Sequence, residues 1–242
     1  MFNDHQGEKN KLLFLHLPHK DITDTMSRKT VTQMSDDVGA FTDTLWNGTV
    51  AVRNSILNDA FIQHIISGDF DPSKFGKFGV QNTLFTFNTH GFIELAKSKT
   101  GSDIPIQTIL EQVSAEYQNS YAAMKITWSV QDTTGYNLDP ATQAYVSHER
   151  TVATDNTPVY TLVAVLARMR LWSWLGGHMQ KANMGVYRRW ATLTFDPQNT
   201  AYEAVQTALN AAFARNIIDL PTAQNIFDTS MQCERDFFTA FV

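Results

Sequence analysis

The stretch DLPTAQNIFDTSMQCERDFFTAFV, residues 219–242, decides the interpretation of the whole chain. Pro221 suits the first turn of a helix, and apolar residues recur after it at helical spacing. Glu234 falls inside this apolar stripe and not opposite it. A carboxylate buried without a partner costs several kcal/mol, so Glu234 needs either a partner or a raised pKa. The stripe consists of Ala223, Ile226, Phe227, Ser230, Phe237 and Phe241.

The same helical periodicity continues upstream of residue 219. Prolines at 72, 105, 140 and 158 each stand where a further helix begins, and helical spacing also runs from Ser27 to Gly68. No segment shows the sustained alternation of a β-strand. The sequence therefore predicts an all-α fold of eight or so helices. We expect one domain over residues 26–242, preceded by an irregular arm over residues 1–25.

The composition is typical of a globular protein, with 43% hydrophobic and 18% charged residues and a formal net charge of -5. Nucleic-acid binding needs clustered Lys and Arg for phosphate contacts, so we expect no nucleic-acid partner. No apolar run approaches the roughly twenty residues of a membrane span, and the N-terminal residues lack the apolar core of a signal peptide. Cys233 is the only cysteine, which excludes an internal disulfide. These features predict a cytoplasmic protein without a membrane partner.

Five polar residues from different predicted helices fall on apolar stripes. One alternative is structural: a buried phenol satisfies a single hydrogen bond, and a buried arginine and glutamate form an ion pair. Because all five belong to one helical bundle, a shared pocket between helices is the other alternative. There the phenols would donate, the glutamate would accept and the arginine would supply fixed positive charge. The five are Asn82, Tyr145, Arg168, Tyr187 and Glu234.

Metal sites fit the sequence poorly. His16 and His19 are more simply interpreted as an exposed or satisfied pair than as ligands. His148-Glu149 is not followed by the second histidine of a zinc protease. A di-iron bundle needs carboxylate and histidine ligands from several facing helices, and the chain offers only half of such a set. We therefore expect no metal and no other cofactor. The di-iron half-set is His90, Glu94, Glu111 and Glu116.

Nucleophilic and phosphate-binding sites fit no better. Cys233 has no basic neighbour on its own stripe and is expected to pack as a small apolar residue. The pair Gly176-Gly177 is more simply a helix C-cap than part of a phosphate loop.

Several motifs, taken in order, resemble the TenA family, which includes thiaminase II and has the heme-oxygenase-like all-helical fold. The resemblance covers about residues 45–241 and begins with NDAFIQHIISGDFDPSKFGKFGVQN, residues 58–82. The later motifs are AYVSH (144–148), AVLARMRLWSWLG (164–176), VYRRW (186–190) and CERDFF (233–238). The resemblance implies a single-domain, TenA-like helical bundle. It also implies a homo-oligomer, because relatives assemble through helix faces.

Three positions of the family's active site keep their residue type in this chain. They are Tyr145 in AYVSH, Tyr187 in VYRRW and Glu234 in CERDFF. The resemblance therefore implies that Glu234 would act as acid or base and that Tyr145 and Tyr187 would orient a ligand.

Other positions of that active site depart from the family. Its pocket aspartate is Asn82 here, and the tyrosine three residues later is Phe85. Its catalytic cysteine aligns with Arg168, and a one-residue slip would give Met169 instead. Trp172 takes an aromatic position. Since neither arginine nor methionine is a thiolate nucleophile, we do not expect cysteine-dependent thiaminase chemistry.

The replacement by Arg168 leaves two alternatives for the pocket. Arg168 either anchors an anionic ligand through a bidentate contact, or it pairs internally with Glu234. The first function hypothesis is a TenA-like protein that binds a small organic molecule, with ligand contacts from Asn82, Phe85, Arg168 and Trp172. The others are a heme-oxygenase-like redox enzyme, with a di-iron, heme or quinone-type cofactor, and a non-catalytic binding protein. The sequence leaves open whether the protein is an enzyme, and if so whether a hydrolase or an oxidoreductase.

Overall fold

The computed structural model describes residues 40–242, and this part of the chain forms helices without any β-strand. The predicted all-α fold is confirmed. The arm predicted for residues 1–25, with His16 and His19, lies outside the described residues. The helices are α2 (Ala40–Gly48), α3 (Val50–Leu57), α4 (Ala60–Ser67), α5 (Pro72–Ser98), α6 (Ile104–Thr127), α7 (Pro140–Asp155), α8 (Pro158–Met179), the 3-10 helix η1 (Gly185–Tyr187), α9 (Arg188–Thr194), α10 (Ala201–Ala214) and α11 (Leu220–Thr239).

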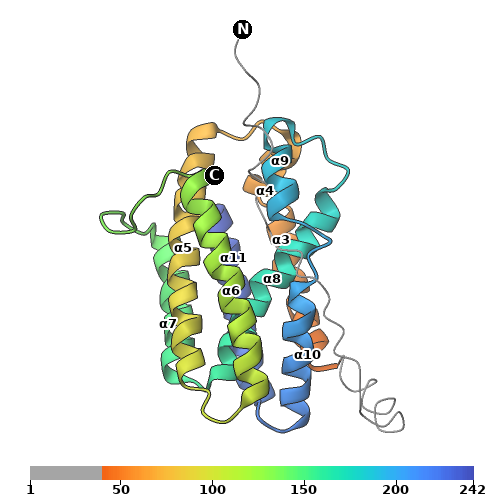
Figure 1. Cartoon of the computed structure of the whole chain (residues 1–242). Coiled ribbons are helices and arrows are strands. Elements are labelled where there is room, and N and C mark those ends of the chain that lie inside the picture. The colour runs from red at the N-terminus through yellow and green to blue at the C-terminus, as the bar shows by residue number, and fades with distance from the viewer. Residues whose placement is uncertain (1–39) are drawn as a thin grey trace, which may run out of the picture.

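Helix α8 lies at the centre of the bundle (Figure 1). It contacts α5, α7, α10 and α11, while α5 also packs against α6 and α7. Every residue from 159 to 168 is buried. A helix with apolar residues on all its faces is buried by neighbours on every side. The run TLVAVLA, residues 161–167, makes this part of α8 such a helix. Arg168 is therefore held deep inside the protein by the helix that carries it.

Aspartate caps combined with proline define where most of the long helices begin. Asp71 accepts from the backbone N–H of Ser73 before α5, and Asp139 and Asp219 cap α7 and α11 in the same way. An N-cap of this kind contributes about 1 kcal/mol, and proline in the first turn has no N–H that would need a partner. These local signals are the reason that the predicted starts at Pro72, Pro140 and Pro221 agree with the structure.

Two local predictions differ from the structure. The helical pattern upstream of Gly68 is divided, within the described residues, into three short helices, because Thr49 interrupts it and Asp59 caps a new start at Ala60. Gly176 and Gly177 do not form a C-cap, since α8 continues through Met179. A Cβ at Gly176 would lie 1.7 Å from the carbonyl oxygen of Phe195, so this glycine permits the end of α9 to approach α8.

An aromatic core surrounds the C-terminal helix. Phe237 and Phe238 of α11 pack against Phe78 of α5, with ring centroids 5.3 and 6.0 Å apart. Phe61 of α4 contacts Phe78 and Phe238 at 4.5 and 5.3 Å. The stripe predicted on this helix is thus confirmed as core, and Glu234 lies within it, fully buried. Among the described residues, none of the helices is both long and apolar enough to cross a bilayer.

Candidate functional site

Arg168, Glu234, Asn82 and Trp172 form one buried, hydrogen-bonded group. Arg168 Nη1 donates to Glu234 Oε1 at 2.6 Å, and Nη2 donates to Asn82 Oδ1 at 2.5 Å. Trp172 Nε1 donates to the second Glu234 oxygen at 2.8 Å. Glu234 is 0% exposed and Arg168 is 7% exposed. The partner that Glu234 requires is therefore Arg168, and the internal pairing is the alternative that the structure shows.

Aromatic rings enclose the Arg168 guanidinium. Its central carbon lies 3.7 Å from the centre of the Trp172 ring and 4.7 Å from that of Phe85. Burial acts to lower the pKa of Arg168 and the charge of Glu234 acts to raise it, with a net upward shift. The guanidinium therefore stays charged, and Glu234 supplies its counter-charge.

Tyr145 lies behind Phe85, with the two ring centroids 4.4 Å apart. Its hydroxyl is fully buried and has no hydrogen-bond partner within residues 40–242. Burial raises the pKa of this phenol well above its usual value, and the nearby Glu234 charge adds to the effect. The structure thus brings Tyr145 close to the group predicted from the sequence, but as a neutral, enclosed side chain.

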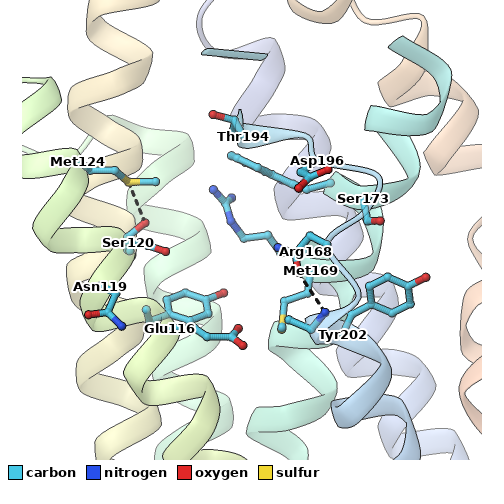
Figure 2. A pocket seen from close by; sticks show the side chains of 15 residues that line it. Glu116, Asn119, Ser120, Met124, Arg168, Met169, Ser173, Thr194, Asp196 and Tyr202 are labelled. Carbon is cyan, nitrogen blue, oxygen red and sulfur yellow. Dashed lines mark hydrogen bonds between the residues drawn. The ribbon is translucent and has the colours of Figure 1, made fainter. Parts of the chain in front are cut away.

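A cavity of about 120 Å³ adjoins Arg168, between α6, α8 and the segment that joins α9 to α10 (Figure 2). Glu116 of α6 extends into it, and burial raises the pKa of Glu116 to about 7. Among the described residues that line this cavity, Glu116 and Asp196 carry carboxylates and Arg168 is the basic residue. We name it the acidic cavity; its lining includes Glu116, Tyr117, Asn119, Met124, Arg168, Trp172, Ser173, Thr194, Asp196 and Tyr202.

A second cavity, of about 270 Å³, lies on the side of Asn82, between the C-terminal end of α6 and α9. Trp128 and Trp190 contribute two of its walls. The Trp128 ring packs directly against α5 at Gly79. A Cβ at this position would lie 2.2 Å from the ring, so the contact depends on glycine. We name it the tryptophan cavity; its lining is Asn82, Ala123, Met124, Thr127, Trp128, Val186, Arg189, Trp190, Leu193 and Thr194.

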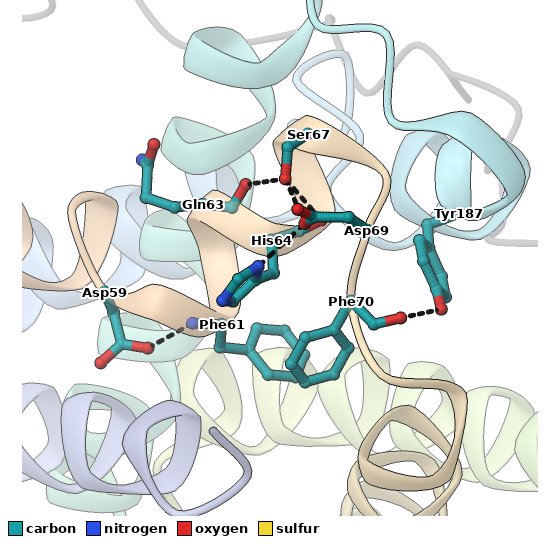
Figure 3. Close-up of polar contacts among 8 residues, drawn as sticks. All are labelled: Asp59, Phe61, Gln63, His64, Ser67, Asp69, Phe70 and Tyr187. Carbon is teal, nitrogen blue, oxygen red and sulfur yellow. Dashed lines mark hydrogen bonds and ion pairs between the residues drawn. The ribbon is translucent and has the colours of Figure 1, made fainter.

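Tyr187 does not join the Arg168 group. Its hydroxyl donates to the carbonyl oxygen of Phe70 at 2.6 Å, at the junction of α4 and α5 (Figure 3). The backbone explains this position, because Met184 N–H donates to Ile66 O at 3.1 Å and so ties η1 to α4. A phenol committed to a backbone carbonyl has no free donor for a ligand. The ligand-orienting role of Tyr187 stays a prediction, and in this structure its hydroxyl is directed at the backbone of Phe70 and not at the Arg168 group.

A second buried carboxyl, Glu149 of α7, lies near this group. It accepts a short hydrogen bond from the hydroxyl of Thr89, while its other oxygen, Oε1, has no partner in the described chain. Burial raises the pKa of Glu149 to about 8, and the hydrogen bond from Thr89 and the charge of Arg168 oppose that rise. Glu149 is therefore largely protonated at neutral pH.

The three residues predicted as catalytic line neither cavity, whereas the predicted ligand-binding residues Asn82, Arg168 and Trp172 do. Phe85 contributes indirectly, as the ring beneath Arg168. Sequence reasoning missed Glu116, which it weighed only as a metal ligand, and Asp196. In the described part of the chain, no three His, Cys, Asp or Glu side chains come together as a metal site would require.

Comparison with known proteins identifies the fold. Neither the protein-family models nor the curated proteins include a match to this chain. Solved structures do match. The TenA family transcription regulator from Silicibacter sp. TM1040 has a TM-score of 0.74 at 14% identity, covering 86% of this chain and 98% of the other. The TenA homologue from P. horikoshii OT3 has a TM-score of 0.70 at 16% identity, covering 83% and 98%.

A third similar structure is the putative TenA-like thiaminase from Sulfolobus solfataricus P2. Its TM-score is 0.66 at 21% identity, with coverage of 83% of this chain and 94% of the other. At such identities the similarity establishes the fold and leaves the activity open. The chain has the TenA-like, all-helical fold that its motifs predict.

Proposed function

We propose that this TenA-like protein binds a small organic molecule, neutral or positively charged, in the acidic cavity. One observation carries the proposal: the charge of Arg168 is already neutralised by Glu234, while Glu116 and Asp196 face the same space. The net charge that a ligand meets is therefore negative. The hydrogen bonds to Glu234 and Asn82 use two of the five N–H donors of Arg168, and Glu234 balances its charge, so an anion would gain little net electrostatic attraction there.

The walls of the acidic cavity favour an amine. A protonated amine gains from the carboxylates of Glu116 and Asp196 and from the faces of nearby aromatic rings. Tyr117 of α6 and Tyr202 of α10 supply such rings. A hydroxyl group in the same position would gain the hydrogen bonds without the charge. We therefore expect amines to bind more tightly than alcohols of the same shape.

Binding, not cysteine-dependent hydrolysis, is the function that these residues support. The position that the TenA resemblance assigns to the nucleophile holds Arg168, and Cys233 is on α11, away from both cavities. Burial raises the pKa of the Cys233 thiol to about 12, so almost no thiolate exists at neutral pH. Glu234 is fully buried and lines neither cavity, so a ligand in either cavity would not contact its carboxylate.

Three probes of one shape test the proposal: benzylamine, benzyl alcohol and benzoate. Calorimetric titration should give the order amine, alcohol, carboxylate, from tightest to weakest. Glu116→Gln should weaken benzylamine by about two- to fivefold, the size of a partly exposed ion pair. Glu111→Gln is the matched control, because Glu111 lies on the same helix, is exposed and lines neither cavity.

The pH dependence gives a second arm to this test. Glu116 is charged above its pKa of about 7, so benzylamine affinity should rise between pH 6 and pH 8, and Glu116→Gln should remove the rise. Tighter binding of benzoate than of benzylamine would contradict the proposal. Loss of that benzoate binding in the double variant Arg168→Met with Glu234→Leu, which removes the buried pair as a whole, would then establish the anion-anchor alternative.

A further inference from the structure

We propose that the tryptophan cavity is the second compartment of the same binding site and receives an apolar arm of the ligand. The ligand class is then an amine that carries a hydrocarbon chain. The inference rests on the proposed function, because it places the amine in the acidic cavity. It adds a compartment, and with it a requirement for a second, apolar part of the ligand.

The two cavities adjoin one another. Met124 of α6 and Thr194 of α9 line both, so the two side chains stand at the boundary between them. Figure 2 shows these two residues on either side of the space next to Arg168. Behind them, Asn82 lines the tryptophan cavity and is bonded to Arg168, which lines the acidic cavity. Two side chains thus belong to the walls of both cavities.

Met124 is suited to a boundary that a ligand crosses. Its unbranched thioether has three rotatable bonds and adapts to irregular shapes. It is held by one weak contact, from the hydroxyl of Thr86 to its sulfur at 3.6 Å. Thr194 is the last residue of α9, where the helix ends. Neither residue closes the boundary with a strong interaction.

The tryptophan cavity is chemically suited to hydrocarbon. Trp128, Trp190, Leu193 and Ala123 present carbon surfaces. An apolar cavity of about 150 Å³ takes up benzene, so a volume of about 270 Å³ exceeds what one ring needs. Its walls are also braced, since Trp190 packs edge-on against Phe75 at 4.9 Å.

Charge fixes the orientation of the ligand. In the described chain the tryptophan cavity is lined by no carboxylate, and its charged residue is Arg189, on the exposed side. A protonated amine is repelled there and attracted by Glu116 and Asp196. The amine therefore lies in the acidic cavity, and the hydrocarbon chain passes Met124 and Thr194 toward Trp128.

The test is a series of n-alkylamines, from ethylamine to octylamine, titrated into the protein and followed by NMR. Each methylene that leaves water should tighten binding by about fourfold, from about 0.8 kcal/mol per buried CH2. The gain should end once the tryptophan cavity is filled. The quantity measured is the ratio of octylamine to ethylamine affinity, so ethylamine serves as the internal reference in every variant.

Two variants block the tryptophan cavity, and one serves as control. Ala123→Phe fills it from its wall, and Thr127→Phe fills it from its exposed rim in case the first variant folds poorly. Both should bring the octylamine-to-ethylamine ratio close to one. Ala122→Phe adds the same ring to an exposed neighbour outside both linings, and should keep the wild-type ratio.

The outcomes separate the two proposals. If ethylamine and benzylamine bind but chain length changes affinity by less than twofold, the second compartment is overturned and the proposed function stands. The second compartment is likewise overturned if Ala122→Phe lowers the ratio as much as Ala123→Phe does. If no amine binds at all, the proposed function fails and this inference fails with it.

Discussion

Removing Glu234 should cost far more stability than removing Glu234 and Arg168 together. The variant Glu234→Leu leaves a guanidinium buried at 7% exposure, with its counter-charge gone and, among residues 40–242, Asn82 as its remaining hydrogen-bond partner. Breaking a buried ion pair at one end costs about 3–5 kcal/mol, because the remaining charge is uncompensated. Trp172 also loses the acceptor of its indole N–H, and this loss is included in that range because the contacts form one network.

The double variant, Glu234→Leu with Arg168→Met, removes both charges. Apolar replacement of a buried pair is often neutral or stabilising, so most of the loss should be recovered. A shortfall of about 1–3 kcal/mol should remain, because Asn82 Oδ1 then has no donor. With a typical stability of about 5–15 kcal/mol, the single variant loses a large fraction of the total and the double variant does not.

Urea unfolding, followed by tryptophan fluorescence and by far-UV circular dichroism, measures both variants. The two probes should give coincident transitions, which licenses the comparison of free energies. An Arg235→Ala variant controls for loss of a cation, since the ion-pair partner of Arg235 within the described part of the chain is its neighbour Asp236, at the surface. A cost below about 1 kcal/mol for Glu234→Leu would refute the reasoning. It would mean that Arg168 does not remain inside when its partner is removed.

Three further predictions concern residues outside the ion pair. Glu149 has a folded-state pKa of about 8, above the usual carboxyl value, so its neutral form favours folding and stability should fall as pH rises from about 5 to 8. Glu149→Gln should flatten this fall, whose slope approaches about 1.4 kcal/mol per pH unit, as pH-dependent urea unfolding would reveal. Cys233 should react slowly with iodoacetamide at pH 8 in the native protein and rapidly in urea; equal rates, followed by mass spectrometry, would show that its thiol is not shielded. Gly176→Ala should lower the melting temperature by several degrees, because its Cβ meets the Phe195 carbonyl, whereas Gly177→Ala has open space and should be neutral or slightly stabilising.

The sequence predicts the fold well because its local signals agree with one another. The Asp-Pro and Asp-x-Pro pairs at residues 71–72, 103–105, 139–140 and 219–221 mark helix starts in the structure, whereas Asp196-Pro197 lies in the segment between α9 and α10. The apolar spacing after each of the four starts marks the buried face. The same spacing places Glu234 among phenylalanines, where its carboxylate needs a partner of opposite charge. The sequence indicates Arg168 as that partner, because Arg168 too lies on an apolar stripe and buried opposite charges pair with each other.

Periodicity does not locate Tyr187 or the two cavities. Tyr187 belongs to a short 3-10 helix whose direction depends on the backbone bond between Met184 and Ile66, over a hundred residues apart in sequence. Glu116 and Asp196 sit at half-buried positions that resemble any surface carboxylate in the sequence. They share a cavity because α6 packs against α10, the helix that follows Asp196 in the chain, and such a long-range contact leaves no periodic signal at either residue.

The burial of the Tyr145 hydroxyl determines how its hydrogen can exchange with solvent. Its ring packs against Phe85, its hydroxyl is fully buried, and no acceptor within residues 40–242 binds the hydroxyl hydrogen. Isotope exchange at that oxygen then requires the surrounding helices to separate briefly. The exchange rate of this hydroxyl hydrogen in heavy water would therefore report how often α7 and α5 separate in the native protein.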